Sequence, residues 1–247
     1  MRLELNTFSI VARCDITGRL GVAVATAVPA VGSMCPFTRA NVGAVSTQSW
    51  VNPYLAIAVL DAIAQGTDAP AALEQVMATD EGRELRQIGV VDAQGRAASW
   101  SGEDCTSWFG HEVGGGFAVQ GNMLTGPDVI AAMADAYRGS AGRPLDERLM
   151  RVLEAADAVG GDKRGKQSAA LRIHGAEDYP ALDLRVDEHA QPIAELRRVL
   201  EIARLQLVPF VEGMPRRGRP AGPAPEEVTR ILALSPPSRP GGGGSAL

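Results

Sequence analysis

The sequence predicts an α/β (α+β) protein whose main domain is a four-layer αββα sandwich of two antiparallel sheets. Three observations favour this class. Short β-branched and apolar segments follow one another through tight turns, and such hairpins join antiparallel strands. The helical segments come mostly in pairs, which suits layers laid over sheets. The chain of 247 residues is also long enough to bury a substantial core.

The chain is expected to begin with a hairpin. Residues 7–12 are β-branched and apolar, residues 15–19 form a turn in which Gly18 supplies a positive φ, and residues 20–27 form a second strand rich in alanine and glycine. The small side chains leave room for another layer to pack closely. The elements expected next are a strand over 41–50, helices over 54–64 and 70–78, and strands over 87–92 and 96–101.

Residue types at the helix starts support these assignments. Asn52 and Asp68 are favoured N-cap residues, and a proline follows each of them within the first turn. Residues 54–64 are apolar nearly all round, so this helix is expected to be buried.

Glycines and a change in composition define the rest of the chain. Residues 103–116 are expected to form a loop, and one domain is expected over residues 1–210. From 211 to 247 the chain is rich in Pro, Gly and Arg, which predicts a flexible tail with one short helix over 226–234. The elements between are a strand over 117–120, helices over 128–137 and 145–159, strands over 168–173 and 182–186, and a helix over 192–207.

Charge and composition exclude several classes of protein. The net charge of −5 and the pI of about 5.3 leave no basic face for nucleic acid. No apolar run reaches the roughly 18 residues of a membrane span, so no membrane partner is expected. The three cysteines are few, odd in number and far apart, which is typical of reduced thiols in a cytoplasmic protein. No pair of histidines has metal-ligand spacing, so neither a metal nor another cofactor is expected.

Polar clusters stand at the ends of several predicted elements. Thr7 begins the first strand, and a threonine there can act as a nucleophile whose own α-amine is the base. Amide and hydroxyl groups outnumber histidines in the other clusters, and such groups stabilise an oxyanion. Each cluster also has an ordinary structural explanation, since threonine often begins a strand and Gly121-Asn122 is a common turn pair. The glycine-rich stretch 160–165 likewise suits a helix C-cap followed by a solvated loop.

Five segments resemble the DUF1028 family, a bacterial family of unknown function. They are TFSIVARCDITGRLGVAVA, VGAVSTQSWVNP, RQIGVVDAQGR, VQGNMLTGPDV and GGDKRGKQSAAL, and the resemblance extends from Thr7 to Leu205. It implies the αββα fold of N-terminal nucleophile (Ntn) hydrolases, with Thr7 at the nucleophile position. The cleft residues it implies are Thr47, Gln48, Asn52, Gln120, Gly121, Asn122, Asp162, Arg164, Gln167 and Ser168.

The chain departs from the family pattern at Ala27, where many relatives carry a basic residue. A lysine at this position would help to lower the pKa of the nucleophile. Three other residues are candidates to supply that positive charge, namely Arg39, Lys163 and Arg164.

The leading interpretation is a hydrolase of small, linear, non-peptide amides. Thr7 attacks the substrate carbonyl, and the Asn122 side chain and the Gly121 N–H stabilise the oxyanion. Arg164 binds a substrate carboxylate, and Asp162 orients either Arg164 or the amine of the nucleophile. Thr47, Gln48, Asn52, Gln120, Gln167 and Ser168 would contact the substrate.

This chemistry requires a free amine on Thr7, so the Asn6–Thr7 bond must break, for example by autoproteolysis. Two other interpretations stay open. A blocked N-terminus would make the chain a non-catalytic binding or assembly protein that keeps the fold. A proteasome-like peptidase is the third interpretation, and assembly into large rings would distinguish it.

A homodimer or higher homo-oligomer is also expected. The helix predicted over 192–207 carries more apolar surface than one sheet face needs. Packing of this helix on its own domain is the alternative.

Overall fold

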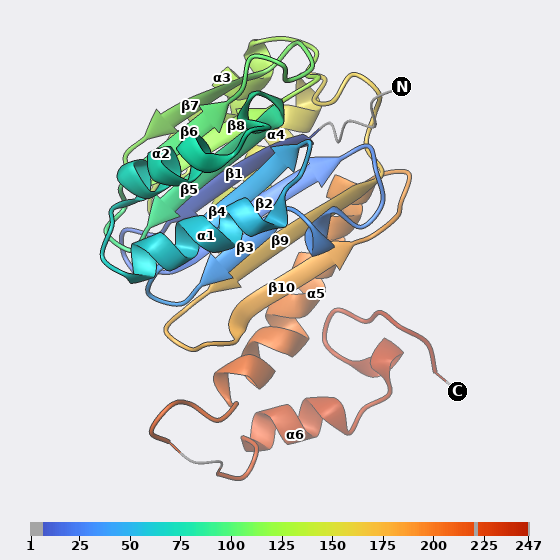
Figure 1. Cartoon of the computed structure of the whole chain (residues 1–247). Helices are drawn as coiled ribbons and strands as arrows, with labels where there is room; N and C mark the ends of the chain where they lie inside the picture. The colour runs from blue at the N-terminus through green and yellow to red at the C-terminus, as the bar shows by residue number, and fades with distance from the viewer. Residues whose placement is uncertain (1–6, 220–221, 247) are drawn as a thin grey trace.

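The computed structural model describes residues 7–219 and 222–246. The expectations about residues 1–6, including the state of the Asn6–Thr7 bond, lie outside the described residues. Two antiparallel sheets with helices on their outer faces confirm the predicted α+β class and the αββα layering (Figure 1).

Within the described residues, the two sheets have six and four strands. Across the larger sheet the order is β10 (Pro180–Val186), β9 (Ser168–His174), β2 (Leu20–Thr26), β1 (Thr7–Arg13), β8 (Phe117–Gly121) and β7 (Gly110–Gly114). Across the smaller sheet it is β3 (Pro36–Arg39), β4 (Gly43–Ser49), β5 (Arg86–Asp92) and β6 (Ala97–Ser101). The helices are α1 (Pro53–Ala64), α2 (Ala69–Thr79), α3 (Asp128–Gly139), α4 (Leu145–Ala158), α5 (Pro192–Glu212) and α6 (Glu226–Leu232).

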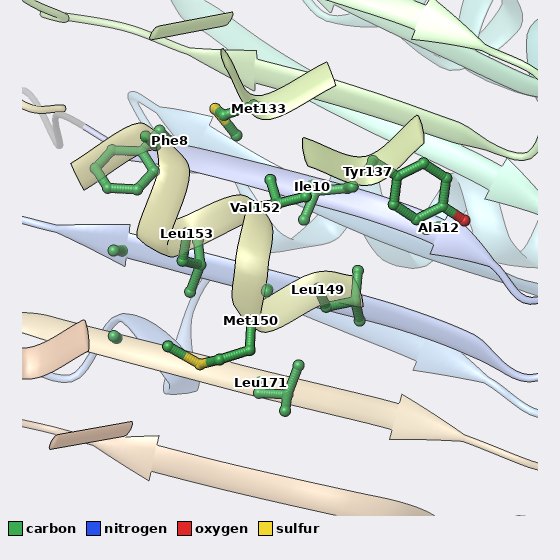
Figure 2. Packing of buried hydrophobic residues seen from close by; sticks show 14 of the residues in the cluster. Phe8, Ile10, Ala12, Met133, Tyr137, Leu149, Met150, Val152, Leu153 and Leu171 are labelled. Atoms are coloured by element: carbon green, nitrogen blue, oxygen red, sulfur yellow. The ribbon is translucent and has the colours of Figure 1, made fainter. Parts of the chain in front are cut away.

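Side chains of β1 point alternately to the two faces of the larger sheet. Phe8, Ile10 and Ala12 pack beneath α3 and α4 (Figure 2), whereas Val11 faces the smaller sheet. Helix α5 joins α3 and α4 on this outer side, and α1 and α2 cover the outer face of the smaller sheet. Thr7 and Ser9 therefore point between the two sheets, as Val11 does.

Two strands are additions to the predicted set. The prediction of a loop over 103–116 is wrong for residues 110–114, which form β7. This strand pairs with β8 through a tight glycine turn. A side chain at Gly110 or Gly114 would collide with the ring of Trp108 or Phe117, so the glycines that suggested a loop allow this edge strand to pack. Strand β3 is a four-residue edge strand that begins with proline, a residue that edge positions tolerate.

The segment after the main domain carries the short helix expected near 226–234. This helix, α6, lies beyond the end of α5 (Figure 1), and Val228 and Ile231 on it are buried. The amide of Gln206 on α5 also donates to the carbonyls of Pro240 and Gly242 at 2.9 and 3.0 Å. Helix α5 itself runs to Glu212, beyond the predicted end at 207 and two residues past the predicted domain boundary.

Flexibility of residues 213–247 stays a prediction, which limited proteolysis tests. Few apolar side chains anchor this segment, so we expect the first cleavages to fall within it and to leave a stable core. Protection equal to that of β9 would contradict the prediction.

Most apolar residues of α5 pack within the chain, whereas Leu205 and Phe210 are exposed. Ile193, Leu196 and Leu200 are buried against the larger sheet, and Val199 and Leu207 pack on the same cluster. The observation that predicted an oligomer is therefore explained by packing on its own domain. Oligomerisation stays a prediction, and a light-scattering mass of about 25.9 kDa at micromolar concentration would contradict it.

Glu147 joins α4 to α5 through a network of arginines. Its carboxylate accepts from Arg197 and Arg151 at 2.7 Å and from Arg204 at 3.0 Å. Burial alone raises the pKa of Glu147, but hydrogen bonds from Arg197, Arg204 and Arg151 outweigh it and bring the pKa to about 2.

Glu147→Gln is expected to lower the free energy of unfolding by about 2 kcal/mol at pH 7. A carboxylate with a lowered folded-state pKa stabilises the fold above its unfolded pKa and loses that effect as pH falls. The difference from wild type should therefore shrink as pH falls from 4.5 towards 2, measured by urea unfolding. Glu201→Gln, on the exposed side of the network, is the matched control. An equal loss in both variants would contradict the prediction.

Candidate active site

Polar side chains replace apolar ones between the sheets at the end where β1 begins. Thr7 and Thr26 are opposite each other on β1 and β2, and Thr7 Oγ1 donates to Thr26 Oγ1 at 3.2 Å. Both residues are fully buried. The hydroxyl predicted to be the nucleophile thus lies on the inner face of the larger sheet.

Both sheets contact the carbonyl of Thr7. The backbone N–H of Asn122 donates to it at 3.0 Å from the larger sheet. Gln48 Nε2 donates to it at 3.2 Å from the smaller sheet. These two bonds fix the backbone of Thr7 at the junction of the sheets.

Gln87, at the start of β5, connects the members of this polar layer. Its Oε1 accepts from Gln48 Nε2 at 2.8 Å and from Asn122 Nδ2 at 3.0 Å. Its Nε2 faces three acceptors, namely Ser101 Oγ at 2.8 Å, the Gly121 carbonyl at 2.9 Å and the Gly110 carbonyl at 3.2 Å. Gln87 is completely buried.

The two carbonyls set the direction of the amides. A carbonyl oxygen can only accept, so the amide nitrogen of Gln87 must face Gly110 and Gly121. Its oxygen then faces Asn122, which must present Nδ2. One N–H of Asn122 Nδ2 donates to Gln87 Oε1, so its second N–H can donate to another group.

A second branch runs through Ser9, two residues along β1 from Thr7. Ser9 Oγ donates to Gln48 Oε1 and accepts from Gln120 Nε2, both at 2.6 Å. Within residues 7–219 and 222–246, Gln120 Oε1 has no hydrogen-bond partner although it is buried. Gly89 on β5 makes room for this amide, because a side chain there would overlap it.

The loop over 160–167 closes the outer end of β2. The buried carboxylate of Asp162 accepts from the backbone N–H of Arg164 at 2.9 Å and lies 3.4 Å from its guanidinium. Burial raises the pKa of Asp162, although hydrogen bonds from Arg164 and from the backbone N–H of Ala27 oppose the rise. The Gln167 N–H donates to the carbonyl of Thr26 at 2.7 Å, so the loop is tied to the partner of Thr7.

Several sequence-predicted residues have structural roles instead of joining the polar layer. Thr47 shares the face of β4 that Val45 presents to the helices, and its Oγ1 lies 3.5 Å from the Asn52 carbonyl. Asn52 caps α1 by accepting from Tyr54 N. Ser168 Oγ donates to the Val28 carbonyl at 2.6 Å and supports the turn after β2.

Gly121 is paired on both sides, with Phe8 of β1 and Gly110 of β7. The three cations considered as replacements for a basic residue at position 27 also have partners. Arg39 pairs with Asp61, Lys163 donates to the Ser107 carbonyl, and Arg164 pairs with Asp162.

Four residues of the polar layer are absent from the predicted site: Ser9, Thr26, Gln87 and Ser101. A period of two along β1 places Ser9 on the same face as Thr7, so the sequence contained that signal. Whether Gln87 belongs to the polar layer depends on the pairing register of β4 and β5, which places it opposite Gln48. Register between distant strands is not readable from a single sequence.

The chemical groups of the layer are hydroxyls and carboxamides. At the end of the layer remote from Thr7, Ser101 Oγ forms a hydrogen bond of 2.9 Å with His111 Nδ1. Burial lowers the pKa of His111. Across the described part of the chain no group of three or more His, Cys, Asp or Glu side chains is arranged to hold a metal ion. Nor does any helix in those residues have the length and apolar character to cross a bilayer.

The fold and the polar layer define an αββα protein with a buried threonine at the head of a central strand. The model of DUF1028, a family of unknown function, matches residues 7–196, and the chain belongs to that family. The crystal structure of protein SPO2555 from Silicibacter pomeroyi, also assigned to DUF1028, is similar with a TM-score of 0.80 and 28% identity, over 87% of this chain and 93% of that one.

Two further structures show weaker similarity. Anbu (ancestral beta-subunit) from Yersinia bercovieri has a TM-score of 0.38 and 11% identity, over 84% of this chain and 98% of its own. An Anbu (Gly-1) mutant from Hyphomicrobium sp. strain MC1 has a TM-score of 0.36 and 13% identity, over 84% of this chain and 99% of its own. No curated protein matches the chain.

Proposed function

We propose that the chain is an Ntn-type amidohydrolase that cleaves the C–N bond of a small linear amide, with Thr7 as nucleophile. One observation carries the proposal: the Thr7 side chain is directed between the sheets, in a layer of donors whose orientation is fixed. A buried polar layer is rigid when its groups are paired, and this one holds the Gln48 and Asn122 donors in place beside Thr7.

The reaction starts from a free α-amine on Thr7. Hydroxyls and carboxamides do not titrate near neutral pH, whereas an α-amine has a pKa near 8 and can act as base. The hydroxyl attacks the substrate carbonyl carbon while the amine takes its proton. The C–N bond then breaks, the leaving amine receives the proton, and water hydrolyses the remaining ester.

The second N–H of Asn122 Nδ2 is the proposed oxyanion donor. Its orientation is supported by Gln87, so the donor does not have to reorganise during the reaction. The role given to the Gly121 N–H is less well supported, because Gly121 is paired with both neighbouring strands.

Arg164 is the proposed carboxylate-binding residue. Its guanidinium is partly exposed, and Asp162 holds it near the outer end of β2. A planar guanidinium binds a carboxylate through two hydrogen bonds, which would position a substrate that carries an acid group. The substrate-binding role of Gln120 is less well supported, because its buried Oε1 lies against Gly89 of β5.

The proposal is tested by hydrolysis of a panel of small linear amides, with and without a terminal carboxylate, by following the released amine. Activity that disappears in Thr7→Ala and persists in Thr79→Ala, an exposed threonine of α2, would support it. Hydrolysis by Thr7→Ala at the wild-type rate would overturn it. Binding of an amide without turnover would favour the non-catalytic interpretation.

A further inference from the structure

The polar layer reaches the protein surface at His111, on the edge strand β7. This strand lies beside β6, an edge strand of the smaller sheet (Figure 1). His111 is opposite Gln120 on β8, so strand alternation directs its imidazole to the inner face of the larger sheet. Ser101 on β6 is opposite the buried Gln87. The half-buried Ser101 and the exposed His111 thus continue the layer to solvent.

The hydrogen-bond partners of Ser101 define the proton positions at this end of the layer. Ser101 Oγ accepts from Gln87 Nε2 at 2.8 Å. The single proton of the hydroxyl is then directed to His111 Nδ1, 2.9 Å away. A ring nitrogen accepts only when it carries no proton, so this arrangement selects the neutral imidazole with its proton on Nε2.

Protonation of His111 would reverse its bond to Ser101. Nδ1 of an imidazolium carries a proton and must donate to Ser101 Oγ, so it competes with Gln87 Nε2 for the lone pairs of that oxygen. The positive charge would also stand behind the hydroxyl towards which the Gln87 N–H points. Both effects weaken the bond between Gln87 and Ser101.

Gln87 carries this change towards Thr7. Its Oε1 accepts from Asn122 Nδ2 at 3.0 Å and from Gln48 Nε2 at 2.8 Å. Gln48 Nε2 also donates to the Thr7 carbonyl at 3.2 Å. Connected hydrogen bonds polarise one another, so a weaker bond at Ser101 weakens the hold on Asn122. Two backbone carbonyls still accept from Gln87 Nε2, at 2.9 and 3.2 Å, so the amide would loosen without rotating.

The charged groups near β7 lie on the opposite face from His111. Strands β6 and β8, which flank the imidazole, carry no titratable side chain. Glu112, the next residue along β7, pairs with Arg138 on α3, and Arg138 also faces Asp135 there. Partial burial lowers the pKa of His111, so its neutral form prevails at pH 7 and protonation occurs as pH falls through that pKa.

We propose that His111 is a positioning residue for amide hydrolysis. Its neutral imidazole holds the Asn122 donor in place through Ser101 and Gln87, and protonation of the ring loosens that donor. The inference rests on the proposed function, because the step it controls is stabilisation of the oxyanion.

The first test compares kcat for amide hydrolysis between pH 5 and pH 8 in the full-length wild type and in His111→Asn. Asparagine offers an acceptor near the position of Nδ1 but does not titrate. The ratio of the two kcat values cancels the titration of the Thr7 amine, which both proteins share. The ratio of wild type to variant should be constant above pH 7 and fall about fivefold at lower pH, the rate equivalent of one hydrogen bond. His189→Asn, at an exposed histidine, is the matched control and should give a constant ratio.

His111→Phe keeps a ring but offers Ser101 no acceptor. Its kcat at pH 7.5 should be about fivefold below wild type with KM unchanged, because the loss falls on the transition state. His111→Asn should keep the wild-type kcat at that pH, which separates positioning from packing. A constant ratio for His111→Asn across the pH range, or an equal loss of kcat in both variants, would overturn the proposal.

A second readout does not depend on activity. The side-chain amide signal of Gln87 in the ¹⁵N-labelled full chain should shift with the midpoint of the His111 titration in the wild type and stay in place in His111→Asn. A signal that does not shift in the wild type would overturn the proposal, and this measurement decides should His111→Phe not fold. Absence of hydrolysis in the wild type would overturn the proposed function, while the Gln87 signal would still decide whether His111 controls the layer.

Discussion

Gln87→Leu is expected to lower the free energy of unfolding by about 4 kcal/mol, since each buried polar group left without a partner costs about 1–3 kcal/mol. Leucine fills a similar volume but cannot bond to Gln48, Asn122 or the Gly121 carbonyl, all of which are buried. The same variant should lose amide hydrolysis, because Asn122 would no longer be oriented.

Urea unfolding of Gln87→Leu and Gln75→Leu measures this effect. Gln75 lies on the exposed face of α2, so its replacement controls for the change in composition. A loss in Gln87→Leu no larger than in Gln75→Leu would show that the carboxamide does not organise the layer. Folded Gln87→Leu with full activity would show that Asn122 is oriented by other contacts.

Thr7→Ala is expected to lower hydrolysis by about 10³-fold or more, as removal of a nucleophile commonly does. Thr7→Ser keeps the attacking oxygen and should keep measurable activity. Initial rates of amine release on the best amide of the panel check both variants. The free energy of unfolding of Thr7→Ala should fall by only about 1 kcal/mol, the usual value of one hydrogen bond. A large loss of stability would instead make Thr7 a structural residue.

Much of the fold could be predicted from the sequence because local signals agree with it. Asn52 and Asp68 begin α1 and α2 as their side chains predict, each accepting from a backbone N–H of the first turn. The apolar period along β1 and α4 likewise places the residues of the main core. Strand β7 was not predicted because glycines are typical of loops, whereas here they make room for the rings of Trp108 and Phe117.

The candidate site was less predictable than the fold, for a reason of geometry. Thr7, Gln48, Gln120 and Asn122 do meet in one buried layer, and their motifs suggested them. Thr47 is adjacent to Gln48 in sequence, yet strand alternation places it on the opposite face. Motif membership therefore identifies segments, while strand pairing decides which side chains in them meet.

Intact mass spectrometry of the purified wild type beside Thr7→Ala tests the central claim most directly. If Thr7 is an N-terminal nucleophile, the wild type should lose the residues before Thr7, because its hydroxyl attacks the Asn6 carbonyl and water opens the resulting ester. The Thr7→Ala protein should keep them. A wild type that retains Met1–Asn6 and still hydrolyses an amide would contradict the account, because an acylated nitrogen cannot serve as the base.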